Sequence, residues 1–177
     1  MKLITLPKLF ITLVTGIAIT TAAIAAGLAG ASASGHGTLL VTNDSQGNSV
    51  RRQFSFSARE MPDGTVTGNA VLTNPAFTGD TEQQYQLQID ISCMNVIGNT
   101  FFFGGTTQRT NDPNLVDAVY FSVEDNGTPG RNLDRISDAV FFDDDPNTTG
   151  DPGLCVGIQI GDFPMHTIET GNITTRQ

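Results

Sequence analysis

Apolar and polar residues alternate along most of the chain after residue 37, which is the pattern of half-buried β-strands. In the clearest run, 85–92, every second residue is tyrosine, leucine or isoleucine and the residues between them are polar. Over 50–58, Phe54 and Phe56 share one face and serines occupy the other. Clusters of Gly, Pro, Asn and Asp separate these runs and form turns. Beyond the N-terminal segment no helical period lasts more than a turn, so the pattern predicts an all-β protein.

The turn spacing divides the chain into short strands. The strands expected are 38–42, 50–58, 65–73, 85–92, 101–103, 116–124, 136–142, 154–160 and 168–175. Short strands at such regular spacing predict an antiparallel β-sandwich, with a β-barrel as the alternative. The run Phe101-Phe102-Phe103 does not alternate, which indicates a strand that is buried on both faces. We interpret these three rings as core rather than as a ligand site.

The first 33 residues have the pattern of a signal peptide. Two lysines within 1–8 precede an uncharged run, 9–30, and Ala31-Ser32-Ala33 is the small-residue pattern that a signal peptidase accepts. We predict cleavage before Ser34, which leaves one domain over 34–177 in a secreted or cell-surface protein. The alternative is an uncleaved membrane anchor, since about 20 apolar residues span a bilayer. Threonines, glycines and the Ala-rich end of the run favour cleavage.

The remainder of the chain is strongly acidic. After residue 33 it has seven arginines, no lysine and eighteen acidic side chains, a net charge of −11. Such a balance repels phosphate backbones and anionic lipid. Nucleic acid is therefore not expected as a partner, and membrane contact is expected only through an uncleaved signal segment. An unidentified protein or a polysaccharide remains as the partner, and solubility alone is the simpler explanation of the charge.

The chain has two cysteines, Cys93 and Cys155, and both follow the predicted signal peptide. In an oxidising compartment they are expected to form one disulfide. The alternative is two buried free thiols. The alternation of 85–91 continues to Cys93 and places it on the apolar face, so the bridge is expected inside the core. The alternation of 154–160 points Cys155 to the opposite face, which leaves this location in conflict.

The segment 125–134 is the strongest candidate site. Its Asn-Gly and Pro-Gly pairs favour sharp turns, which bring its acidic residues together. Side-chain oxygens of Asp125, Asn126 and Asp134, with Glu124 or Asp138 in addition, are candidate calcium ligands, because calcium takes six to eight oxygens. The alternative is a well-formed turn in which Asp125 accepts backbone hydrogen bonds.

A second acidic run, Asp143-Asp144-Asp145 with Asp151, is a weaker candidate for a cation site, and such runs are more often simply solvated. No catalytic set is recognised, and no cofactor other than the candidate calcium ion is expected. His36 and His166 are not spaced as metal ligands, and we interpret both as incidental.

Glycoside hydrolysis needs only two carboxylates. A carboxylate-dependent hydrolase acting on extracellular polysaccharide is therefore the alternative to a non-catalytic exported module with a binding or structural role.

Several short motifs occur in a fixed order. They are Cys93, Ile97-Gly98-Asn99, Gly104-Gly105, Val123–Gly130 and Asp134–Ser137. This order resembles small secreted bacterial β modules that share a Gly-Asn hairpin and an Asp-Asn-Gly-x-Pro-Gly loop followed by an aspartate. The match covers about 91–137, and the extra acidic residues in 143–151 depart from it. The resemblance implies export and a β fold, and it implies no established activity.

Overall fold

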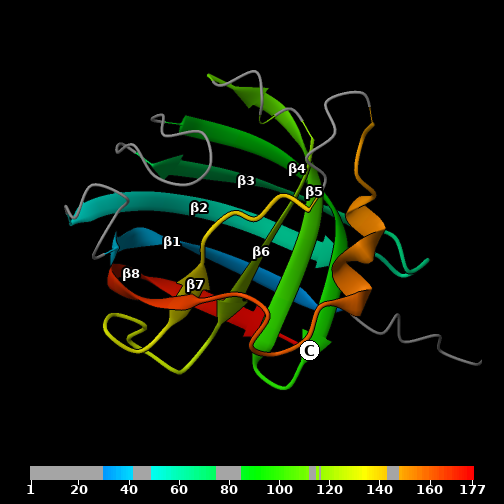
Figure 1. The fold of residues 1–177 in the computed structure, drawn as a ribbon. Coiled ribbons are helices and arrows are strands. Elements are labelled where there is room, and N and C mark those ends of the chain that lie inside the picture. Colours follow the sequence, from blue (N-terminus) through cyan, green and yellow to red (C-terminus); the bar gives the residue numbers. More distant parts are fainter. Residues whose placement is uncertain (1–29, 42–48, 75–84, 112–114, 116, 143–147) are drawn as a thin grey trace, which may run out of the picture.

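The computed structural model describes residues 30–41, 49–74, 85–111, 115, 117–142 and 148–177, which form a closed antiparallel barrel (Figure 1). The elements are β1 (Ser32–Val41), β2 (Val50–Glu60), β3 (Val66–Asn74), β4 (Tyr85–Ile97), β5 (Thr100–Thr110), β6 (Ala118–Glu124), β7 (Arg135–Ser137), the 3-10 helix η2 (Pro152–Gly157) and β8 (Met165–Arg176). Each strand pairs with the next, and β1 pairs with β8. The all-β class is confirmed, and the architecture is the barrel that was the alternative to a sandwich.

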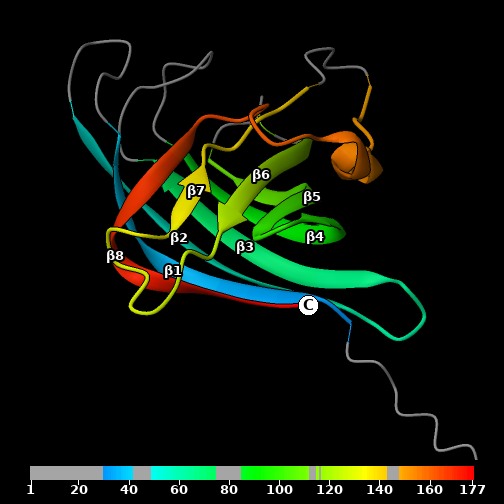
Figure 2. The ribbon, with the colours of Figure 1, turned by 90° about the horizontal axis from the view of Figure 1, so that it is seen from below.

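The two ends of the barrel are built differently. At one end lie the β2–β3, β4–β5 and β6–β7 connections, the start of β1 and the end of β8 (Figures 1 and 2). We call this the terminal end. The other four connections, including the long one between β7 and β8, belong to the opposite end. The segment 125–134 lies at the terminal end.

Phenylalanine rings fill the barrel interior. Phe56 packs against Phe103 and Phe121 with ring centroids 5.6 and 5.9 Å apart, and the rings of Phe103 and Phe121 are 5.0 Å apart. Phe54 and Phe101 extend this stack toward either side. The inward positions of Phe54 and Phe56 confirm the alternation expected from sequence, and they make the interior a packed core rather than an open lumen.

The disulfide between Cys93 and Cys155 is confirmed, with a Cα–Cα distance of 6.1 Å, and both cysteines are buried, but Cys93 does not share the apolar face of 85–91 as predicted. The β4–β5 register shifts between Ile91 and Cys93. An inserted residue reverses the side-chain alternation of a strand. Met94 therefore packs against the interior, whereas Cys93 faces the outside of the barrel.

The strand predicted over 154–160 is wrong as well, since 152–157 forms a 3-10 helix. Asp151 caps this helix through its Oδ1, which accepts a hydrogen bond from the Gly153 amide at 2.8 Å, and proline occupies its first position. Cys155 is fully buried, while its two neighbours in the chain are exposed. Because successive 3-10 residues are 120° apart, one inward residue leaves both of its neighbours facing outward.

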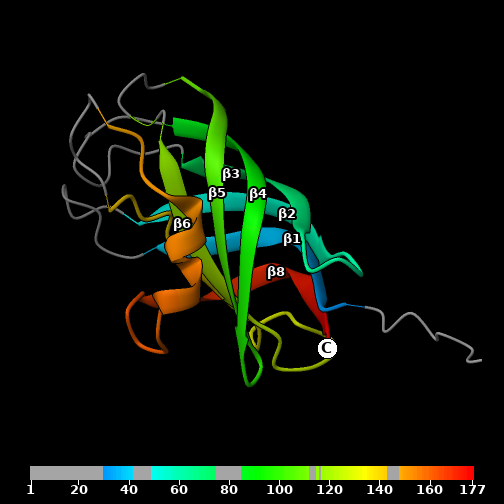
Figure 3. The same ribbon diagram turned by 90° about the vertical axis from the view of Figure 1, so that its right-hand side faces the viewer.

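The η2 segment covers the outer face of β4, β5 and β6, where it closes a second apolar cluster (Figure 3). The cluster consists of Cys93, Phe102, Ala118, Tyr120, Cys155, Ile158 and Phe163. Phe102 is only 2% exposed, because η2 covers it from outside while its neighbours in β5 face the interior. This confirms that the Phe101–Phe103 run is buried on both faces.

The first residues of β1 are integral to the barrel. Ser32 and Ala33 pair with β2 on one side and β8 on the other, and Ala33 is buried in the core. The predicted cut before Ser34 therefore falls two residues inside the strand, and cleavage there stays a prediction.

A chain that starts at Ser34 is expected to be about 2 kcal/mol less stable than one that starts at Gly30. It loses the buried Ala33 methyl group and several hydrogen bonds of the β-ladder. Urea unfolding of the two chains tests this, with a chain starting at Ser32 as the control that keeps the strand. Equal unfolding midpoints for all three chains would contradict the prediction.

Candidate functional site

Asp134 anchors the predicted loop to the barrel. Its side chain is fully buried, Oδ1 accepts a hydrogen bond from the Asn126 amide at 2.9 Å, and Oδ2 accepts one from the Ile173 amide at 2.8 Å. The Ile168 amide donates to the backbone carbonyl of Asp134 at 3.0 Å. One aspartate thus joins the start of the loop, its end and the last strand of the barrel.

Asp125 makes a second link to β8. Its Oδ1 accepts a hydrogen bond from the Gly127 amide at 3.1 Å, which forms a local Asx-type turn. Its Oδ2 accepts from the amide and the hydroxyl of Thr175, at 2.9 and 3.1 Å. Asp125 therefore holds the C-terminal part of β8 as well as its own turn.

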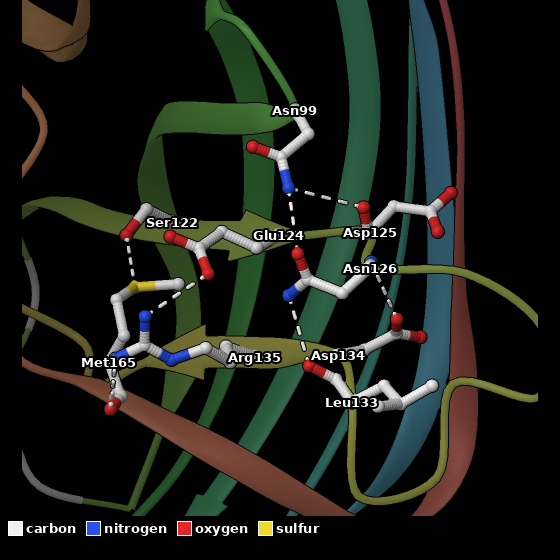
Figure 4. A network of polar contacts seen from close by, with 9 residues as sticks. All are labelled: Asn99, Ser122, Glu124, Asp125, Asn126, Leu133, Asp134, Arg135 and Met165. Carbon is white, nitrogen blue, oxygen red and sulfur yellow. Dashed lines mark hydrogen bonds and ion pairs between the residues drawn. The ribbon is translucent and has the colours of Figure 1, made fainter.

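Asn126 connects the loop to the β4–β5 hairpin (Figure 4). Its Nδ2 donates to the Leu133 carbonyl at 3.0 Å, and its Oδ1 accepts from Asn99 Nδ2 at 2.8 Å. The same Asn99 Nδ2 lies 3.3 Å from the Asp125 carbonyl. The Gly-Asn hairpin and the Asp-Asn-Gly-x-Pro-Gly loop, two motifs noted in the sequence, are therefore in direct contact.

Gly130 is required by lack of space. A Cβ atom at this position would lie 1.7 Å from Asp134 Oδ2 and 2.9 Å from Asn172 Oδ1. The Gly130 amide donates to that Asn172 oxygen at 2.7 Å. The Pro-Gly pair therefore does more than turn the chain, because it lets the loop backbone approach the buried carboxylate.

The three residues predicted as calcium ligands, Asp125, Asn126 and Asp134, are thus brought together. All five of their side-chain oxygens accept hydrogen bonds from the protein. This is the turn arrangement that the sequence left open beside calcium binding, and calcium binding stays a prediction. Within the described ranges, no three His, Cys, Asp or Glu side chains are grouped in a way that could hold a metal ion.

Arg135 strengthens the closure of the barrel beside this loop. β7 has only three residues, so few backbone hydrogen bonds join β6 to β8. Arg135 Nη1 lies 3.2 Å from Glu124 Oε2 on β6, and its Nη2 donates to the Met165 carbonyl on β8 at 3.2 Å (Figure 4). One side chain thus spans all three strands.

Of the second predicted acidic loop, Asp143–Asp145 lie outside the described residues. The structure gives Asp151 a structural role, since its carboxylate caps η2. Its backbone carbonyl also accepts a hydrogen bond from the Tyr120 hydroxyl at 2.5 Å. Asp151 thereby ties the start of η2 to the outer face of β6.

A polar cluster that sequence reasoning missed lies inside the end of the barrel opposite the terminal end. Arg52 and Asp138 form an ion pair, and His166 Nε2 lies 3.3 Å from Asp138 Oδ2. The alternation of the strands could have indicated this cluster. Arg52 lies two residues before the inward Phe54, and His166 lies two residues before the inward Ile168, so both polar side chains occupy inward positions. We interpreted His166 as incidental because the sequence does not reveal that its strand lies beside Asp138.

The space beside this cluster is small. A cavity of about 20 Å³ is lined by Arg52, Asp138 and apolar side chains that include Leu39 and Leu72. That volume holds about one water molecule. A carboxylate beside a histidine is a unit of acid–base chemistry. In this cluster, however, the carboxylate is paired with an arginine, and the adjoining space is too small for a sugar ring.

Comparison with known proteins adds no relative. No protein-family model, curated protein or solved structure matches this chain.

Proposed function

We propose that this chain is a non-catalytic exported or cell-surface module that binds a partner or forms part of an extracellular assembly. The packed barrel interior is the observation that supports this most strongly. Phenylalanine rings occupy the interior, and the cavity beside Arg52 has room for about one water molecule. The polar groups described at the two ends contact the backbone or each other. Partner binding is therefore assigned to the outer surface of the barrel.

Two features support export. The first is the signal-peptide pattern of residues 1–33. The second is the Cys93–Cys155 disulfide, since disulfides persist mainly in oxidising compartments. Among the residues that the structure describes, there is no helix with the length and apolar character needed to cross a membrane.

The oxidised full-length chain is expected to show no turnover when it is screened against soluble polysaccharides. Asp138 is the carboxylate to vary. Among the ion pairs of the described residues, only that of Asp138 with His166 joins a carboxylate to a histidine. Asp138→Asn is the test variant, and Asp90→Asn, which changes an exposed aspartate on β4, is the matched control. Turnover that is lost in Asp138→Asn and kept in Asp90→Asn would identify a carboxylate-dependent hydrolase and contradict the proposal.

A further inference from the structure

We propose that the segment from Leu154 to Ile160, which includes the end of η2 and the residues after it, docks a basic protein partner through the exposed side chains of Leu154, Val156 and Ile160. The partner would present an exposed apolar side chain surrounded by lysine or arginine. This inference rests on the proposed function, since it names the partner chemistry of a non-catalytic binding module.

The three side chains are unusually exposed for their type. Leu154, Val156 and Ile160 retain 54%, 67% and 62% of their accessible surface. All three lie within one stretch of seven residues, and Phe142, which is 54% exposed, packs its ring against Phe163 of the same connection. Scattered exposed apolar residues need no explanation, but three of them within seven residues are typical of a protein-interaction site.

The scaffold beneath these side chains is held firmly. Cys155 is bonded to Cys93 of β4, and Ile158 and Phe163 are each only 4% exposed in the outer cluster. Asn95 Nδ2 also donates to the Val156 carbonyl at 3.3 Å. Cys155, Ile158 and Phe163 therefore already occupy the side of the segment that faces the barrel. Leu154, Val156 and Ile160 have no room on that side and stay exposed to solvent. A fixed apolar surface of this kind loses little conformational entropy when a partner binds.

The surrounding charge selects the partner. The connection from 138 to 164 contains neither lysine nor arginine. Two aspartates of this connection, Asp151 and Asp162, are exposed, and they precede and follow the three apolar residues in the sequence. Interfaces combine an apolar centre with a polar rim of complementary charge. A second copy of this chain, with a net charge of −9, would bring like charges together, whereas a basic surface would be attracted.

Labelled synthetic peptides of equal length provide a direct test. The first combines lysine with leucine, the second replaces leucine with serine, and the third replaces lysine with glutamate. Binding to the oxidised full-length chain is measured by fluorescence anisotropy. The dissociation constant of the lysine–leucine peptide is expected to be lower than that of either other peptide by a factor of about ten or more. Only this peptide matches both the apolar centre and the acidic rim.

Three variants then locate the binding site. In Leu154→Ser/Val156→Ser/Ile160→Ser, binding of the lysine–leucine peptide is expected to weaken about tenfold or more, since anchor residues dominate interface energies. Asp162→Asn is expected to weaken it less and to reduce its salt dependence. Leu133→Ser removes an exposed leucine within the segment 125–134 at the terminal end, and it should leave binding unchanged. Melting temperatures near that of the unmodified chain show that the variants fold.

Three results would overturn this inference. They are equal binding of the two lysine peptides, equal binding by the unmodified chain and the triple variant, and a dimer in sedimentation that disappears in the triple variant. Each of these leaves the proposed non-catalytic function standing. Turnover that depends on Asp138 would instead refute the proposed function, and it would do so whether or not the peptide binds η2.

Discussion

Replacing both cysteines, Cys93→Ala with Cys155→Ala, is expected to lower the free energy of unfolding by about 4 kcal/mol. The bridge joins residues 62 positions apart in sequence, and without it the unfolded chain regains the loop-closure entropy of that segment. The folded state also loses the covalent link that holds η2 over Phe102 and Tyr120. Urea unfolding of the oxidised protein and the double variant measures the difference.

The control for this experiment is Leu154→Ser on the same segment. Leu154 is more than half exposed, so its replacement is expected to change stability by less than about 0.5 kcal/mol. Equal midpoints for the double variant and the oxidised protein would contradict the prediction. That result would mean that the outer cluster holds η2 in place without the bridge.

Asp134→Ala is expected to lower the free energy of unfolding by about 3–5 kcal/mol. It removes two hydrogen bonds to a buried carboxylate and leaves the amides of Asn126 and Ile173 without their acceptors. The loop then loses one of its attachments to β8 beside the short β7, and those through Asp125 and Gly130 remain. Thermal melting measures the effect, and for a domain of this size the melting temperature should fall by roughly 10 °C.

Two variants refine this test. Asp134→Asn keeps the shape but turns one acceptor into a donor that faces a backbone amide, so a loss of about 2 kcal/mol is expected. Asp125→Ala should cost less than Asp134→Ala, because Asp125 is only partly buried. A melting temperature that stays unchanged in Asp134→Ala would show that the loop does not depend on this carboxylate.

The same melts decide between the turn and calcium. Because every side-chain oxygen of Asp125, Asn126 and Asp134 already accepts a hydrogen bond, we expect equal melting temperatures in millimolar calcium and in excess chelator. A cation at a hundred times its dissociation constant would add about 2.7 kcal/mol. A calcium-dependent increase that is lost in Asp125→Ala would establish the predicted calcium site instead.

The sequence predicted the local features of this protein well. The alternation around Phe54 and Phe56 identifies an inward face, and that face is the one that packs in the barrel. The Gly-Asn hairpin and the turns of 125–134 follow from the backbone preferences of glycine, asparagine and proline. The two cysteines form the single disulfide that the sequence predicted. Each of these features depends on residues close together in sequence.

The errors arose where contacts distant in sequence decide the structure. The alternation of 154–160 fits a strand, but Asp151, Pro152 and the bond from Cys155 to β4 hold 152–157 as a 3-10 helix. The inserted residue near Cys93 is visible only in the pairing of β4 with β5. In the same way, the sequence does not reveal that Arg52, Asp138 and His166 lie together, because they come from β2, the residue after β7, and β8.

The sequence by itself therefore determined most of the β-strands, the turn chemistry of 125–134, the cysteine pair and the acidic composition, since side-chain period, backbone preference and charge are local properties. Only the tertiary structure decided that the sheet closes through pairing of β1 with β8, two strands from opposite ends of the chain. It also decided that Asp134 serves two distant backbone amides and that the apolar residues of η2 face outward. These outcomes depend on which segments meet when the barrel closes, and the period of a single strand carries no information about its neighbours.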